Sequence, residues 1–112
     1  QLGTLPLTRT LELISPVCSV LISAHAAGVI HRDIQPGNVM LGEFGQVLVL
    51  DWGIALDRNK LTPTQAQETQ LVGTPCFLPP EFFHGAVGSH DERSDVYLLG
   101  AIAYECDGHG SA

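Results

Sequence analysis

The segment HRDIQPGNVML, residues 31–41, restricts the possible folds of this chain more than any other stretch. Its first eight residues contain two ionic groups, a proline, a glycine and two amides, and the three that follow are apolar. Turn-forming residues followed by a short apolar run are typical of a loop that enters a strand. The segment therefore predicts an ordered polar loop that leads directly into a β-strand.

A helix is expected before this loop, because apolar residues recur there at helical spacing. Proline is tolerated at the first helical position, so Ser15 as N-cap and Pro16 after it predict a helix over about 16–27, ended by Gly28. A longer, kinked helix from about residue 8 is the alternative.

Two short strands and a long loop are expected next. Residues 39–41 and 46–50 predict strands around a turn bounded by Gly42 and Gly45. Residues 54–76 lack clear periodicity and predict a long polar loop, which in a compact domain is usually functional or disordered.

Two further helices complete the expected fold. Residues 78–85 predict a short helix opened by proline. Residues 94–106 are apolar nearly all round and predict a buried helix, capped by Ser94 or Asp95. Together these elements give an α+β fold that is mainly α.

Composition limits the class of protein. The chain has 112 residues, enough for one small domain, and its 45% hydrophobic content suits a globular chain. Its formal net charge of −7 argues against binding to a nucleic-acid polymer. The three cysteines lack metal-ligand spacing, and their odd number argues against a disulfide framework, so a reducing, cytoplasmic setting is expected.

The apolar runs of the chain and its two ends bear on whether it is membrane-bound and whether it is whole. The longest mostly apolar run, Val17–Ile30, has 14 residues and includes polar ones, so no membrane segment is expected. No basic region precedes it, so no signal peptide is expected. The chain begins at Gln1 and ends in the small-residue tail CDGHGSA, which favours a fragment.

Three oxygen-bearing side chains could converge beside the expected strands. Asp33 and Asn38 lie in the loop before the first strand, and Asp51 follows the second. Mg²⁺ prefers oxygen ligands, commonly takes one or two carboxylates, and leaves positions for substrate phosphate. Phosphoryl transfer needs this neutralisation of charge together with an orienting base. Taken singly, each residue is also an ordinary turn residue, and only the combination favours the functional interpretation.

Four motifs in this order resemble those of the protein kinase family. HRDIQPGN at 31–38 resembles the catalytic loop, and DWG at 51–53 the metal-binding motif. GTPCFLPPE at 73–81 resembles the end of the activation segment, and SDVYLLG at 94–100 the start of the central helix of the large lobe. The stretch HRDIQPGNVMLGEFGQVLVLDWGIA, residues 31–55, is most similar to bacterial serine/threonine kinases of the eukaryotic type. The resemblance implies a partial large C-terminal lobe occupying residues 1–112, with ATP and Mg²⁺ as cofactors and protein serine or threonine hydroxyls as substrates.

The resemblance implies roles for five residues near the reaction. Asp33 would accept or orient the proton of the substrate hydroxyl, with Thr74 in contact with it. Asn38 and Asp51 would hold Mg²⁺ and, through it, the nucleotide. Gln35 stands where serine/threonine kinases have a lysine that touches the transferred phosphate.

Regulatory and structural roles are implied for others. Arg32 would pair with a phosphorylated residue of the activation segment, where the candidates are Thr62, Thr64 and Thr69. The residues expected to be structural are His31 beneath the loop, Gly53 for backbone freedom, Glu81 as an anchor of the segment, and Asp95, which would hold the loop backbone. His25 is expected to be a core histidine with a partner, whereas His84, His90 and His109 are expected to be exposed.

Departures from the family pattern leave alternatives open. Besides Gln35, Trp52 replaces phenylalanine and Pro79 replaces alanine. There is no glycine-rich loop, strand lysine or partner glutamate, so the resemblance implies that a small lobe lies elsewhere in the parent protein. The isolated chain is therefore expected to be inactive. A pseudokinase-like binding module and an inactive truncated remnant are the alternatives.

Overall fold

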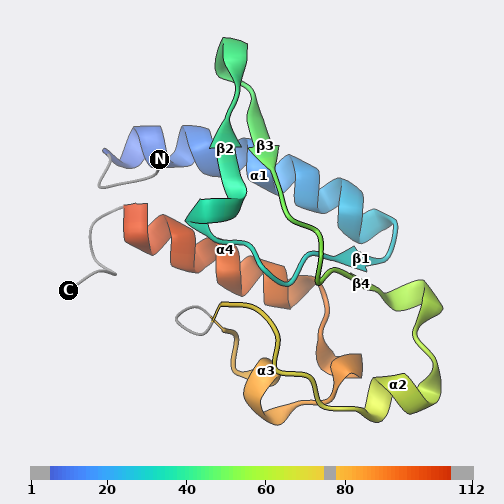
Figure 1. Cartoon of the computed structure of the whole chain (residues 1–112). Coiled ribbons are helices and arrows are strands. Elements are labelled where there is room, and N and C mark those ends of the chain that lie inside the picture. Colours follow the sequence, from blue (N-terminus) through green and yellow to red (C-terminus); the bar gives the residue numbers. More distant parts are fainter. Residues whose placement is uncertain (1–5, 75–77, 107–112) are drawn as a thin grey trace.

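Two long helices, α1 (Leu7–Ala26) and α4 (Glu92–Cys106), lie side by side and run in opposite directions (Figure 1). This is a computed structural model of the chain, and it describes residues 6–74 and 78–106. The buried core forms between the two helices, the polar loop and the strands that follow it. Its buried members are Val17, Leu21, Ile34, Val39, Leu98, Leu99 and Ile102.

Helix α1 is longer than the preferred prediction. It begins at Leu7, so the start at residue 16 is wrong and the alternative start near residue 8 is close to the observed one. Ser15 lies inside the helix and caps nothing, while Pro16 is accommodated within it. Proline removes one helical hydrogen bond, the one to the carbonyl of Glu12, and Glu12 lies on the exposed side where water can replace it. Gly28, at φ 81°, follows the last turn, so the predicted end is confirmed.

Length and composition alone would also allow α1 to cross a membrane. A single helix of this kind is weak evidence, because core helices of soluble proteins pass the same test. One side of α1 is buried against the rest of the chain, through Thr10, Leu13, Val17 and Leu21.

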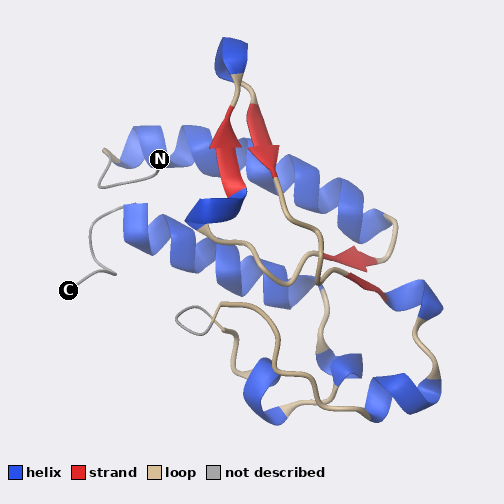
Figure 2. Ribbon diagram, viewed as in Figure 1, coloured by secondary structure: helices blue, strands red, loops and turns tan. Residues whose placement is uncertain are grey.

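The predicted pair of strands is present as β2 (Val39–Leu41) and β3 (Val47–Val49), which form an antiparallel hairpin (Figure 2). Its second strand is shorter than the predicted 46–50. Residues pair as Val39 with Val49 and Met40 with Leu48. Because alternate residues of a strand face opposite sides, the valines pack on the core while Met40 and Leu48 are 51% and 46% exposed.

The prediction that residues 54–76 form only a loop is wrong. Strand β4 (Leu56–Asp57) pairs antiparallel with β1 (Val29–Ile30), and a turn of 3-10 helix, η3 (Arg58–Lys60), follows. Helix α2 (Pro63–Gln67) then begins with a capping box formed by Thr62 and Gln65. Two-residue strands and a single helical turn are too short to produce a periodic pattern in the sequence.

The short proline-opened helix is present as α3 (Glu81–His84), and a 3-10 turn, η5 (Val87–Ser89), leads from it toward α4. Asp91 caps α4, since its Oδ1 accepts from the backbone N–H of Arg93 at 2.9 Å. The predicted caps, Ser94 and Asp95, are instead buried within the helix.

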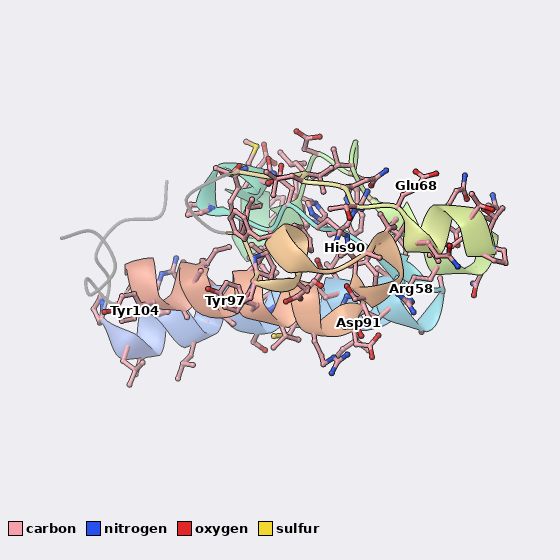
Figure 3. All side chains as sticks on the ribbon, turned by 90° about the horizontal axis from the view of Figure 1, so that it is seen from below. Arg58, Glu68, His90, Asp91, Tyr97 and Tyr104 are labelled. Carbon is pink, nitrogen blue, oxygen red and sulfur yellow. The ribbon has the colours of Figure 1, made fainter. Side chains whose placement is uncertain are left out.

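Helix α4 is not covered on every face, in contrast to the prediction. Val96, Tyr97 and Tyr104 are 61%, 49% and 56% exposed. Figure 3 shows Tyr97 and Tyr104 along this helix.

Candidate functional site

Asp95 connects α4 to the polar loop of residues 31–38. Its carboxylate is fully buried and accepts three hydrogen bonds. The backbone N–H groups of His31 and Arg32 donate to it at 2.9 and 2.8 Å, and Nε2 of His25 donates at 2.7 Å. The central helix therefore fixes the start of the loop through a buried anion, and His25 has the partner expected of a core histidine.

His31 connects the loop to the end of strand β3. Its Nδ1 accepts from the backbone N–H of Asp33 at 3.0 Å, so the hydrogen lies on Nε2, which faces the carbonyl of Leu50 at 2.9 Å. The edge of the buried ring also packs against Trp52, with ring centroids 4.5 Å apart. These contacts are structural and leave no nitrogen of His31 for proton transfer.

Both oxygens of Asp33 face donors from its own loop and from residue 74. Asn38 donates from Nδ2 to the Asp33 carbonyl at 2.8 Å and to Oδ2 at 3.3 Å. The Thr74 hydroxyl donates to Oδ1 at 3.2 Å. Gln35 donates from Nε2 to the same oxygen at 3.0 Å and to the Thr74 hydroxyl at 2.6 Å. Gln35 thus lies in the site and bridges Asp33 and Thr74.

The hairpin brings Asp51 to the same end of the structure as Asn38. The backbone N–H of Leu50 donates to the Asn38 carbonyl at 2.8 Å, which extends the β2–β3 ladder to the residue before Asp51. Asp51 adopts a left-handed backbone at φ 56°, uncommon for a non-glycine residue and often found at functional sites.

Gly53 does not supply the unusual backbone that was expected of it. Gly53 does not have a positive φ, and the neighbouring residue with a left-handed backbone is Asp51. Instead, the N–H of Gly53 donates to Asp51 Oδ1 at 3.3 Å, and a Cβ at Gly53 would lie 3.1 Å from that oxygen.

Asn38 and Asp51 carry oxygen atoms of the kind that could bind a magnesium ion. The amide nitrogen of Asn38 is used by Asp33, which leaves its Oδ1 as the ligand atom, and the Asp51 carboxylate is exposed. The described residues contain no cluster of three or more histidine, cysteine or acidic side chains, which argues against a closed transition-metal site. An open set of one amide and one carboxylate is the kind of site that Mg²⁺ shares with substrate phosphates.

Arg32 is buried without an ionic partner within hydrogen-bonding distance among the described residues. It is 6% exposed, adopts φ 72°, and donates to three neutral acceptors. These are the Ile54 carbonyl at 2.7 Å, Gln70 Oε1 at 3.0 Å and His90 Nδ1 at 3.2 Å. Burial lowers the pKa of the Arg32 guanidinium, and the Asp95 carboxylate partly offsets this. The side chain remains charged and can receive an anion.

Arg32 and Lys60 help to line a pocket of about 320 Å³, and the threonines proposed for phosphorylation are sequence neighbours of other residues that line it, namely Leu61, Gln65, Glu68 and Gln70. Thr62 caps α2 and Thr64 lies within it. Thr69 is exposed and directly precedes Gln70, whose side-chain oxygen accepts a hydrogen bond from Arg32.

Glu81 and Ser94 join the end of this segment to α4. The Ser94 hydroxyl donates to Glu81 Oε2 at 2.7 Å. Glu81 therefore contacts the central helix directly.

Two residues near the site were missed or misplaced from the sequence. Gly73 adopts φ 96°, and a Cβ there would lie 2.9 Å from a Leu78 methyl and 3.2 Å from the Arg32 carbonyl, so only glycine fits. The place of Gly73 directly before Thr74, at the start of the motif GTPCFLPPE, was the sequence signal that could have identified it. His90 was expected to be exposed and is instead fully buried against Phe82 and Arg32. A single histidine in a polar connection carries no periodic signal of burial. His109 lies outside the described residues.

The sequence of the chain is similar to known proteins over most of its length. The family model of the protein kinase domain matches residues 3–108. The chain is 40% identical over 94 residues to the probable serine/threonine-protein kinase PknB of Corynebacterium glutamicum, covering 84% of this chain and 14% of that protein. It is 39% identical over 106 residues to PknB of Mycobacterium leprae, covering 92% and 16%. It is 33% identical over 110 residues to serine/threonine-protein kinase PknD of Chlamydia abortus, covering 85% and 12%. The chain spans less than a fifth of the length of these relatives.

Proposed function

Because this chain belongs to the protein kinase domain family, we propose that it supplies the catalytic loop (residues 31–38) and activation segment (residues 51–81) of a bacterial serine/threonine kinase. The reaction is transfer of the γ-phosphoryl group of ATP to a protein serine or threonine hydroxyl. The observation that carries the proposal is the placement of Asp33, Asn38 and Asp51 around one end of the β2–β3 hairpin.

Asp33 acts as the base or orienting group. As the substrate oxygen bonds to the γ-phosphorus and the bond to the bridging oxygen of ADP breaks, Asp33 receives the hydroxyl proton. Thr74 and Gln35 hold Oδ1 of this carboxylate, and Asn38 holds Oδ2. Three fixed donors keep the carboxylate in one orientation, which is the main protein contribution to such a reaction.

Asn38 and Asp51 would hold the magnesium ion. When bound, Mg²⁺ neutralises the charge that builds up on the transferred phosphoryl group. The exposed apolar face of the hairpin, Met40 and Leu48, begins two residues after Asn38 and is suited to the purine base of ATP.

The remainder of the natural polypeptide supplies the rest of the nucleotide cleft. Residues 1–112 form part of the large lobe in this proposal, and the short share of the relatives' length that they cover supports this. The small lobe contributes the lysine that orients the phosphates. We place the protein in the reducing cytoplasm, with the catalytic loop facing ATP and protein substrates there.

Arg32 receives a phosphate group on the activation segment. Its three present acceptors are neutral, so a phosphothreonine would provide a much stronger, charge-assisted contact. Thr69 is the favoured acceptor of the three candidates, because phosphorylation there needs only a local exchange with the neighbouring Gln70.

A second candidate function is phosphate-independent protein binding, as in a pseudokinase. The neutral Gln35 in place of the expected lysine favours it, since an uncharged amide stabilises the transferred phosphate less than a cation.

The proposal is tested by binding of ATP to the full natural polypeptide with and without Mg²⁺. Asp51→Asn should abolish the Mg²⁺-dependent part of the affinity measured by calorimetry. Asp57→Asn is the matched control, because Asp57 caps η3, accepting from Asn59 N at 3.0 Å, and pairs with Lys60 at 3.9 Å, and neither contact involves Asn38 or Asp51. An Mg²⁺-dependent affinity that survives in Asp51→Asn would contradict the assigned metal site.

A further inference from the structure

His90 lies where three parts of the chain meet. It is fully buried, and its ring stacks on Phe82 of α3 with centroids 4.1 Å apart. Its Nδ1 faces Nη1 of Arg32 at 3.2 Å, and its backbone carbonyl accepts from Nη1 of Arg58 at 2.5 Å. Figure 3 shows His90 and Arg58 on the side of the molecule where η3 approaches the α3–α4 connection. One residue thus joins the catalytic loop, the activation segment and α3.

The contact with Arg32 defines the protonation state of the ring. A guanidinium has no acceptor, so Arg32 must donate and Nδ1 of His90 must accept. The imidazole is therefore neutral, with its hydrogen on Nε2. That Nε2 is buried and has no hydrogen-bond partner within the described part of the chain. Protonating Nδ1 would replace the hydrogen bond by two donors facing each other.

Charged groups around His90 also oppose protonation. Arg32 from the catalytic loop and Arg58 from η3 are cationic, whereas Glu81 of α3 and Asp91 of the adjoining connection are anionic. Burial lowers the pKa of His90 below its ordinary 6.5, the two arginines lower it further, and the two carboxylates only partly offset these effects.

We propose that His90 is a positioning residue that holds the Arg32 guanidinium toward the activation segment only while its own ring is neutral. The contact is fully present above pH 6.5, the ordinary value of a histidine, and is lost as the pH falls through the lower value of the buried ring. Acidification releases Arg32 from His90 and loosens the segment that Arg32 ties down through Ile54 and Gln70.

The coupling between the two side chains rests on geometry alone, whereas its consequence for turnover rests on the proposed kinase function. If a phosphate group binds Arg32, the added negative charge favours protonation of His90. Phosphorylation of the segment should therefore shift the loss of the contact to a different pH, toward the ordinary value of histidine.

Two variants of the full natural polypeptide separate the acceptor from the proton. His90→Gln keeps an oxygen acceptor for Arg32 and cannot titrate. His90→Leu removes the acceptor and keeps an apolar side chain against Phe82. Calorimetry first establishes that each variant folds. Hydrogen exchange of residues 54–70, corrected for the intrinsic effect of pH, is then followed in a pH series that starts at 7.5 and descends to the lowest pH at which the wild type stays folded.

Wild type should protect residues 54–70 at pH 7.5 and lose protection once the pH falls below the pKa of the His90 ring, by about tenfold for each further pH unit. His90→Gln should keep its protection across the series, and His90→Leu should lack it throughout. As the pH falls, the kcat/KM of wild type divided by that of His90→Gln should decrease in parallel with the protection of residues 54–70 in wild type. Equal pH dependence of exchange in wild type and His90→Gln would overturn the proposal. A proton-linked exchange without any phosphotransfer would support the coupling and contradict the kinase function.

Discussion

Removing the Asp95 carboxylate should open the catalytic loop. In Asp95→Ala, the N–H groups of His31 and Arg32 would lose acceptors at 2.9 and 2.8 Å in a site with no solvent exposure. Each unpaired buried donor costs about 1–3 kcal/mol, so the loss is about 2–6 kcal/mol before His25 is considered. Since a domain is stable by only about 5–15 kcal/mol, this is a large fraction of the total.

The matched control is Asp91→Ala on the same helix. Asp91 accepts a hydrogen bond from the backbone N–H of Arg93 at the start of α4, and its carboxylate pairs with the Arg93 guanidinium at 2.8 Å. Neither contact involves residues 31–38. Loss of an N-cap costs about 0.5–2 kcal/mol and should remain local to α4.

Hydrogen exchange by mass spectrometry on the natural polypeptide distinguishes the two variants. Peptides that cover residues 29–40 should exchange about a hundredfold faster in Asp95→Ala, as expected for a loss of about 3 kcal/mol. They should be nearly unchanged in Asp91→Ala. If both variants exchanged alike over residues 29–40, the reasoning that a buried anion holds the loop would be refuted.

Three further predictions concern charge and burial. Gln35→Lys should raise turnover with little change in ATP affinity, because a charged donor to phosphate is roughly twice as strong as a neutral one; steady-state kinetics would contradict this by showing lower turnover. Phosphorylation of Thr69 should raise activity in wild type and have no effect in Arg32→Met, as measured on quantitatively phosphorylated protein; equal activation of both would exclude Arg32 as the receptor. Residues 1–112 alone should be marginally stable and self-associating, because α4 exposes Val96 and Tyr97. They should also be inactive, because the small lobe with its lysine is not part of them. A monomeric, cooperative urea transition together with measurable phosphotransfer would contradict this.

The catalytic-loop geometry was the most predictable part of the structure. Turn residues before an apolar run placed Asp33 and Asn38 at the start of a strand, and the hairpin then brought Asp51 to the same end of the ladder as Asn38. These are local relations, fixed by a few neighbouring residues and by strand pairing, so a single sequence contains them.

Contacts between distant segments were not predictable in the same way. Strand β1 pairs with β4 across a long stretch of chain, and two residues per strand provide no pattern. His90 is buried only because Arg32 and Phe82 arrive from other segments. The cap of α4 at Asp91 was missed because Ser94 and Asp95, equally good cap residues, are used for contacts with Glu81 and the loop.

The most direct test of the account is turnover of the Asp33→Asn variant in the full natural polypeptide. Asparagine can still accept from Thr74 and Gln35 through its oxygen, and it loses only the 3.3 Å bond from Asn38, whose amide still donates to the backbone carbonyl of residue 33 at 2.8 Å. The loop should therefore keep its shape, but the amide cannot receive the substrate proton. The account predicts that kcat falls by about two to four orders of magnitude while the Kd for Mg²⁺-ATP is unchanged. Turnover close to that of wild type would contradict the central claim that Asp33 is the base of a phosphoryl-transfer site.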